Sequence, residues 1–480
     1  MPLILPGNVA SATAVAGYDV ANSCRFDGSS ASMSITPGSN MNLDRWTWSG
    51  WIKRSGLGVV QSIFSCDNAT TDTTELAFDA NDKLNFLNLV SSVIKGKKIT
   101  TRVFRDPSAW YHIVVVWDSG NATAGDRIKI YVNGVRETVF DTSADPDQNT
   151  DSSLGESGLA TLIGVFVGES SRFFNGYMAE VVLIDGTAYA ASDFGEFDED
   201  SPTIWKPIDV SGLTFGTHGF YLDFEASDNL GNDANGGTDL SETNLAAVDQ
   251  ATDTPTNSFC TFNSIATTNS VGNTLTFAEG NCKITNTSDG GWTPAIGNMG
   301  ATNGKWYAEF KVSTIGGASK YGIIDVTQYL DNVNFASTGR AYSYEYYSGD
   351  AYNNGNYDAD YGDSFTTDDI ISVAMDLDNM KLYFAKNGTW QDSGDPTSGA
   401  TGTGTHAYFG GGSNSANAAG VDTYAFAANI HNSSVTEANF GNPSYANSSS
   451  NADGNGYGDF EYAVPSGYYA LCTKNLAEYG

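Results

Sequence analysis

Short alternations of apolar and polar residues, separated by glycine, asparagine and aspartate, run through residues 23–224. The segments RWTWSGWIKRS, WYHIVVVWDS and NGYMAEVVLI are typical of β-strands, because side chains on a strand alternate between two faces. No stretch of ten or more residues in this part has the period of an amphipathic helix. The pattern therefore predicts an antiparallel β-sandwich.

Two hairpins with an Asn-Gly turn occur in different halves of the chain. They are RIKIYVNGVRETVF, around Asn133 and Gly134, and KLYFAKNGTW, around Asn387 and Gly388. Both residue types tolerate positive φ, so each pair favours a type I′ turn between two strands. Strand patterns resume after Phe259 with GKWYAEFKV and DDIISVAMDLD. We therefore expect an all-β chain with a second antiparallel sandwich.

Residues 225–258 are dense in Asp, Asn, Gly and Thr and poor in aromatic residues, a composition typical of a linker. Four side chains there could instead hold calcium, although their spacing lacks the EF-hand pattern: Asp228, Asn232, Asp233 and Asp239. The predicted organisation is an N-terminal attachment segment 1–22, a sandwich 23–224, a linker 225–258 and a sandwich 259–480.

The charge of the chain limits its partners. Its 480 residues include 56 acids and 23 bases, for a formal net charge of -33. Such a surface repels nucleic-acid phosphates and anionic membranes, whose non-specific binding depends on Lys and Arg. No segment has the roughly 18 consecutive apolar residues of a membrane span, and the start MPLILPGN lacks the basic residues of a signal peptide. We expect synthesis in a cytoplasm, with neither nucleic-acid binding nor membrane insertion.

Several of these segments resemble known families in order and spacing. CRFDGSSASMSI, WTWSGWIKRS, WYHIVVVWD, IYVNGV and FNGYMAEVVLIDGTAYAASDF resemble the laminin-G-like concanavalin A-type jelly roll. GKWYAE, DIISVAMDLD, LYF with its following Asn-Gly, and NFG resemble the SPRY domain. MPLILPGN, HGFYLDFEASDNLGNDANGGTD and VPSGYYALCTKNL resemble segments of tailed-phage virion proteins, especially of marine phages, that join these two domains.

The resemblance implies a non-enzymatic structural protein of the virion surface, either a tail fibre or a capsid fibre or decoration. Its partners would be other virion proteins, further copies of the chain, and a host-surface polysaccharide or protein. A trimer is an analogy with other fibres. An extended N-terminal segment with Leu3, Ile4 and Leu5 would attach the chain by adding to a partner's sheet. A purely architectural virion protein and a polysaccharide-degrading enzyme are the alternatives.

Catalytic patterns are incomplete. Glucanases of the concanavalin A-type fold carry Glu-x-Asp-x-x-Glu, whereas the nearest match here, Glu196-Phe-Asp198-Glu-Asp200-Ser201, ends in serine. The histidines have no Gly-x-Ser-x-Gly elbow near them, and His112 within WYHIVVVW is most simply a packed strand residue. We therefore predict no catalytic residues and no cofactor, with calcium left open. Laminin-G-like domains often bind calcium at the sandwich rim, where Asp67, Asp79 and Asp82 are candidates.

A tyrosine-rich segment, GRAYSYEYYSGDAYNNGNYDADYGDSF at residues 339–365, is the candidate ligand site. Tyrosine offers a flat apolar face and a hydroxyl, and asparagine adapts its hydrogen bonds, which suits sugar rings. The alternation of Tyr342, Tyr344 and Tyr346 fits a core-facing strand equally well. The predicted binding residues are Tyr346, Tyr347, Tyr352, Asn353, Asn354, Asn356, Tyr357 and Tyr361.

Overall fold

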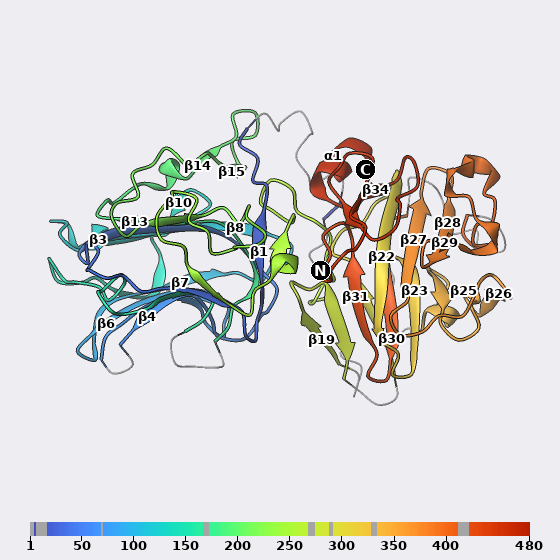
Figure 1. The fold of residues 1–480 in the computed structure, drawn as a ribbon, viewed down its shortest axis with the longest axis horizontal. Coiled ribbons are helices and arrows are strands. Elements are labelled where there is room, and N and C mark those ends of the chain that lie inside the picture. The colour runs from blue at the N-terminus through green and yellow to red at the C-terminus, as the bar shows by residue number, and fades with distance from the viewer. Residues whose placement is uncertain are drawn as a thin grey trace. The chain divides into compact units, whose positions relative to one another are not determined.

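The computed structural model describes residues 4–5, 17–68, 71–166, 172–266, 274–287, 291–327, 334–410 and 422–480. The chain divides into two compact units (Figure 1). The N-terminal unit is Ala14–Thr256, and the C-terminal unit is Asn257–Gly480 together with Met1–Thr13. Each unit is an antiparallel β-sandwich, so the all-β prediction is confirmed. No helix in the described ranges has the length and apolar character needed to cross a membrane.

The N-terminal unit stacks two large sheets (Figure 1). The first has the order β10 (Val135–Arg136), β9 (Ile128–Val132), β8 (Trp110–Asp118), β3 (Arg45–Arg54), β13 (Asn175–Asp185), β1 (Ser23–Asp27) and β18 (Gln250–Ala251), with β16 (Phe220–Leu222) also paired to β13. The second has the order β11 (Phe140–Ala144), β7 (Val93–Val103), β6 (Lys83–Val90), β5 (Thr73–Phe78), β4 (Gln61–Asp67), β12 (Thr161–Ile163), β2 (Ser32–Ile35) and β17 (Ser241–Thr243). A separate ribbon pairs β14 (Gly195–Phe197) with β15 (Trp205–Pro207).

The C-terminal unit also stacks two sheets. One has the order β19 (Leu275–Ala278), β20 (Lys283–Asn286), β31 (Val435–Asn439), β22 (Lys305–Thr314), β27 (Ile370–Asp376), β28 (Lys381–Lys386) and β29 (Thr389–Trp390), with β34 (Tyr469–Ala470) parallel to β22. The other has the order β21 (Trp292–Ile296), β30 (Tyr424–His431), β23 (Ala318–Asp325), β24 (Ala341–Glu345), β25 (Ala351–Asn353) and β26 (Asn356–Asp358). A ribbon of β32 (Asn451–Ala452) and β33 (Asp459–Phe460) precedes the helix α1 (Thr473–Tyr479).

Single short 3₁₀ turns connect several strands: η3 (Ala124–Asp126), η4 (Ala191–Asp193), η5 (Ala247–Asp249), η6 (Phe335–Ser337), η7 (Gln391–Ser393) and η8 (Pro396–Thr401). Both predicted Asn-Gly hairpins are present. Asn133 and Gly134 have φ of 47° and 76°, and Asn387 and Gly388 have φ of 47° and 77°. Positive φ at both central positions is the signature of a type I′ turn, so this prediction is confirmed.

The central strands of the N-terminal unit are buried on both faces. Nearly every residue of β3, β8 and β13 is buried, rather than every second one. One face carries Trp46, Trp48 and Trp117 into the core between the sheets. The opposite face packs against the chain from residue 188 to residue 221, so a layer of loops covers the first sheet from outside.

The predicted linker 225–258 is instead part of the N-terminal sandwich up to Thr256, which corrects the interpretation of its composition. Strand β17 pairs with β2, and strand β18 pairs with β1. Leu230 and Leu240 lie in the hydrophobic core. The polar residues cap turns: the Asp233 carboxylate accepts the backbone N–H groups of Tyr221 and Gly237 at 2.9 and 3.0 Å. Asp and Asn in this segment therefore shape turns within the sandwich.

A buried ion pair fixes the end of this segment to the sheet. Lys53 Nζ on β3 lies 2.6 Å from Asp253 Oδ2, and both side chains are almost completely buried. Trp110 Nε1 donates to the other carboxylate oxygen over 3.0 Å. Asp253 thus connects β3 and β8 to the end of this segment, although Asp253 and Lys53 are 200 positions apart in the sequence.

We expect Asp253→Asn to destabilise the N-terminal unit by about 3 kcal/mol, because it removes the carboxylate charge that faces the buried Lys53 ammonium. The free energy of unfolding from denaturant titration measures the effect. Asp228→Asn, an exposed change in the same segment, is the matched control and should change stability by less than about 0.5 kcal/mol. Equal stabilities of the two variants would contradict a structural role for the pair.

Candidate functional site

The tyrosine-rich segment folds into the edge of the second sheet of the C-terminal unit, on strands β24, β25 and β26. Tyr352 on β25 lies opposite Tyr357 on β26, and their ring centroids are 5.7 Å apart. Tyr346 and Tyr347 form a second ring pair in the turn after β24, at 5.9 Å. Tyr347 is 75% exposed and Tyr357 is 54% exposed. We call Tyr346, Tyr347, Tyr352 and Tyr357 the tyrosine surface.

The other predicted residues of this segment divide into two groups. Asn354 and Asn356 are exposed in the turn between β25 and β26. Asn353 is fully buried, and its amide donates to the carbonyls of Gly339 and Ala341 over 3.2 and 2.8 Å. Tyr361 is 2% exposed and packs in the core. The prediction is corrected for Asn353 and Tyr361, because internal packing and backbone hydrogen bonds occupy both side chains.

The first tyrosines of the segment, which alternate along β24, lie in the hydrophobic core. Tyr342 and Tyr344 are completely buried, and Tyr344 stacks on Phe384 at 5.6 Å. The Tyr344 hydroxyl donates to the carbonyl of Asp363, which lies 19 residues further along the chain. These contacts anchor β24, the strand from which the turn with Tyr346 and Tyr347 begins.

A lysine that the sequence analysis did not single out lies beneath the tyrosine surface. Lys320 on β23 is 3% exposed. Its Nζ lies 3.4 Å from the centroid of the Trp292 ring and 5.8 Å from that of Tyr352. Burial lowers the pKa of the Lys320 ammonium to about 8. Lys320 thereby links Trp292 to the tyrosine surface through cation–π contacts. The signal in the sequence is a lysine within the strand pattern ASKYGIIDV.

A second aromatic cluster lies on the outer side of the first sheet of the N-terminal unit. His112 on β8 is buried and stacks between Trp51 and Trp205, at centroid distances of 4.8 and 5.9 Å. The Trp205 indole N–H donates to His112 Nδ1 over 2.9 Å, and His112 Nε2 lies 2.8 Å from Ser49 Oγ. Burial lowers the pKa of the His112 imidazole to about 3, so the ring is neutral. His112 is a packed strand residue, as the sequence indicated.

Trp205 also lines a cavity of about 340 Å³, which we call the indole pocket. The residues that line the pocket are Tyr131, Gly134, Ala190, Ala191, Ser192, Gly195, Glu196, Phe197 and Trp205. A volume above about 300 Å³ with aromatic walls is typical of small-molecule sites. Sequence analysis missed Trp205, whose only signal is an isolated tryptophan in the proline-flanked segment SPTIWKPID.

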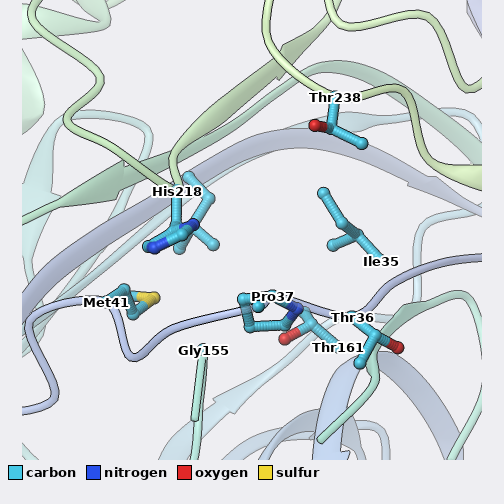
Figure 2. A pocket seen from close by; sticks show the side chains of 10 residues that line it. Ile35, Thr36, Pro37, Met41, Gly155, Thr161, His218 and Thr238 are labelled. Atoms are coloured by element: carbon cyan, nitrogen blue, oxygen red, sulfur yellow. The ribbon is translucent and has the colours of Figure 1, made fainter. Parts of the chain in front are cut away.

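A smaller hollow lies at one end of the same sandwich, where Figure 2 shows Pro37 and Met41 near His218. Its volume is about 150 Å³, and its lining also includes Ile35, Thr161 and Thr238. His218 Nε2 lies 2.9 Å from Ser39 Oγ at its rim. This volume corresponds to about five water molecules and is below the usual size of a ligand pocket. The indole pocket is therefore the better candidate in this unit.

The carboxylates nearest to a glucanase pattern stabilise a hairpin. Glu196 and Asp198 both lie 3.3 Å from the Lys206 ammonium. Asp198 also accepts the backbone N–H groups of Asp200 and Ser201, at 3.0 and 2.9 Å. One lysine and two turn amides thus hold these carboxylates around the connection between β14 and β15.

Each of the three calcium candidates in the N-terminal unit already interacts with other groups of the protein. Asp82 is ion-paired with Arg54 at 3.2 Å and with Arg105 at 2.8 Å, so two guanidinium groups already neutralise it. Asp79 accepts the backbone N–H of Lys83 over 3.0 Å, and Asp67 accepts the hydroxyl of Thr73 over 3.0 Å. Over the part of the chain that the structure describes, no three His, Cys, Asp or Glu side chains converge as a metal site.

The predicted attachment segment is partly visible. Ile4 forms a parallel β-bridge with Met299 in the C-terminal unit. Its N–H donates to the Asn298 carbonyl over 2.8 Å, and its carbonyl accepts the Gly300 N–H over 3.0 Å. Leu5 lies beside Gly300, and Leu3 lies outside the described residues. Ile4 therefore makes an isolated bridge to a segment of its own chain outside the named strands, and attachment to a virion partner stays a prediction.

We expect the stability of the C-terminal unit to rise with pH between about 8 and 10. Below pH 8 both the folded and unfolded states keep the Lys320 proton, and the cost of burying the ammonium is complete. Above pH 8 the folded state loses this proton while the unfolded lysine, with a pKa of 10.5, retains it. The free energy of unfolding should therefore increase by up to roughly 3 kcal/mol across this pH range.

Denaturant titrations of the wild type and of Lys320→Met across this pH range measure the effect. Methionine keeps an unbranched apolar chain without the charge, so the variant should be more stable at pH 7 and lack this pH dependence. A variant whose stability follows the wild-type pH profile would contradict the assignment to Lys320.

Comparisons with known proteins found one family model and several solved structures that are similar to parts of this chain. Residues 27–191 match a family model described as the Concanavalin A-like lectin/glucanases superfamily. The crystal structure of the SPRY domain of human HERC1 is similar at 17% identity and a TM-score of 0.28, over 37% of this chain and 96% of that chain. A heptameric SAP-like pentraxin from Limulus polyphemus is similar at 17% identity and a TM-score of 0.28, over 36% of this chain and 80% of that chain.

Proposed function

We propose that this chain is a non-enzymatic structural protein of a tailed-phage virion, a tail fibre or capsid decoration, that binds a glycan or protein on the host surface. The observation that carries the binding role is the tyrosine surface. Its exposed rings are Tyr347, in the turn after β24, and Tyr357 on β26, and the fully buried Tyr344 anchors β24. Flat rings that are held rigidly offer contact area at a low cost in conformational entropy.

The chemistry of the surroundings suits a polyhydroxylated ligand. Asn354 and Asn356 are exposed next to Tyr357 and supply amide donors and acceptors. Ser348 and Asp350 provide further oxygen atoms in the turn that carries Tyr347. Ring faces that stack on a pyranose, with polar groups at their edges for its hydroxyls, make up the usual layout of a carbohydrate site. The match of residues 27–191 to a lectin-containing superfamily supports a lectin-like role for the chain as well.

The virion assignment rests on the resemblance of the chain ends and of residues 218–239 to phage proteins, and on the net charge of -33. On a particle, many copies would display the same surface, so weak single-site binding would be multiplied by avidity. Oligomerisation, including a trimer, belongs to the same proposal, as does attachment to neighbouring virion proteins through the N-terminal segment.

We expect the purified full-length protein to bind host-surface polysaccharide on a glycan array. The double variant Tyr347→Ala, Tyr357→Ala should bind at least about tenfold more weakly, because stacking residues dominate such interfaces. Arrays run with calcium and with a chelator distinguish calcium-dependent glycan binding from metal-independent binding at the tyrosine surface. Unchanged circular dichroism spectra would establish that the variant is folded.

Tyr457→Ala is the matched control, because Tyr457 is a partly exposed tyrosine of the same unit that packs near Lys474. It should bind like the wild type. If neither the array nor intact host cells retain the wild-type protein in either condition, the chain is an architectural protein without a receptor. Release of reducing sugar from host polysaccharide would contradict the non-enzymatic assignment.

A further inference from the structure

The indole pocket has two aromatic walls that meet nearly at a right angle. Trp205 and Phe197 are a cross-strand pair of the ribbon formed by β14 and β15. Their ring centroids are 4.9 Å apart, with an angle of 72° between the ring planes. Tyr131 of β9 contributes a third ring to the lining. Phe197 remains 42% exposed, although it borders this cavity.

The largest wall is fixed in place before any ligand arrives. The Trp205 N–H is bonded to His112, and His112 in turn is held by Ser49 and stacked on Trp51. A Cβ on Gly195 would lie 2.7 Å from three atoms of the indole ring. Glycine at this position therefore allows the ribbon to approach Trp205 closely. A ring locked on its inner side is a preorganised surface for a ligand.

Hydrogen-bonding groups are scarce in this pocket. The Trp205 N–H is already used by His112. Among the lining residues, side chains with polar atoms are Tyr131, Ser192 and Glu196, whereas the other walls are glycine, alanine and aromatic rings. A sugar ring would leave most of its hydroxyls without partners here, at a cost for each. The lining suits a compact ligand with an apolar surface.

The charge around the pocket favours a positive ligand. Glu196 and Asp198 share the ammonium of Lys206, so two carboxyl groups face one ammonium at this edge of the pocket. The Glu196 side chain is 56% exposed. The whole chain adds a net charge of -33, which concentrates cations near its surface. Aromatic faces attract organic cations through the ring quadrupole.

We propose that Trp205, Phe197 and Tyr131 form a cage for a methylated ammonium group. The N-methyl groups supply the apolar surface that the rings and small residues fit, and the positive charge meets the ring faces and Glu196. The chemistry is shared by a choline head group and by a trimethylated lysine side chain. This site is separate from the tyrosine surface, and its occupancy does not depend on the proposed glycan binding.

The test is a titration of the full-length protein with choline chloride, followed by the ring-current shift of the N-methyl proton signal in NMR spectra. The neutral isostere 3,3-dimethylbutan-1-ol, which replaces the nitrogen by carbon, is the matched ligand control. We expect choline to bind about five- to thirty-fold more tightly than the isostere. Equal binding of the two ligands overturns the proposal. So does the absence of any shift of the N-methyl signal at a choline concentration on the order of 50 mM, which is high enough to detect weak binding.

Two variants locate the binding. Phe197→Ala removes an exposed wall and should weaken choline binding about fivefold or more. Glu196→Gln should weaken it about two- to fivefold and leave the binding of the neutral isostere unchanged. Glu199→Gln, an exposed neighbour outside the lining, is the control and should bind like the wild type. Wild-type affinity in Phe197→Ala, with an unchanged circular dichroism spectrum, would place choline elsewhere and overturn the cage.

Two further ligands distinguish the biological sources of the group. Phosphocholine tests a lipid or teichoic head group, and an acetylated trimethyllysine amide tests a modified protein. Competition of either compound with choline supports the cage, and the tighter competitor identifies the source. Failure of both to displace choline would contradict the proposal, because each presents the same trimethylammonium group.

Discussion

Burial of β3, β8 and β13 on both faces is the constraint from which the organisation of the N-terminal unit follows. A strand that is covered on both sides must place polar residues where partners from other layers can satisfy them. His112 meets Ser49 and Trp205, and Lys53 meets Asp253. Ser49 lies on the neighbouring strand β3, Trp205 belongs to the covering layer, and Asp253 follows β18. The polar contacts therefore help decide where the outer layer lies, and Trp205 is the residue of strand β15 through which that layer reaches His112.

The same constraint explains Glu180, a buried carboxyl on β13. It sits where the register with β3 shifts between Ala179 and Val182, with a φ of 50°. The hydroxyls of Tyr221 and Tyr18 donate to it, at 2.7 and 3.3 Å. Burial raises the pKa of Glu180 to about 8, so the neutral acid is the favoured form in the folded state at neutral pH. The bulge thus places a carboxylic acid among buried side chains, and the hydrogen bond from Tyr18 to it holds the start of the unit.

Sequence patterns predicted the features that depend on neighbours along the chain. Alternation identified the strands, and the two Asn-Gly pairs identified their turns, because a type I′ turn needs positive φ at those two positions only. The segment after Glu225 was misassigned because its partners are distant: β17 pairs with β2, and Asp253 pairs with Lys53. Within the tyrosine-rich segment, composition could not separate Asn353 and Tyr361, which face inward, from Tyr347 and Tyr357, which face solvent.

The two candidate sites differ in the source of their positive charge. Beneath the tyrosine surface, Lys320 already lies against Trp292 and close to Tyr352, so the cation–π partner of these two rings is part of the protein. The rings are left to offer their outer faces and edges to a neutral, hydroxyl-rich ligand. Next to the indole pocket, the nitrogen base that the described residues place against Trp205 is His112, which burial keeps neutral. The aromatic rings that line the indole pocket retain their attraction for a cation, and the ligand must supply that positive charge.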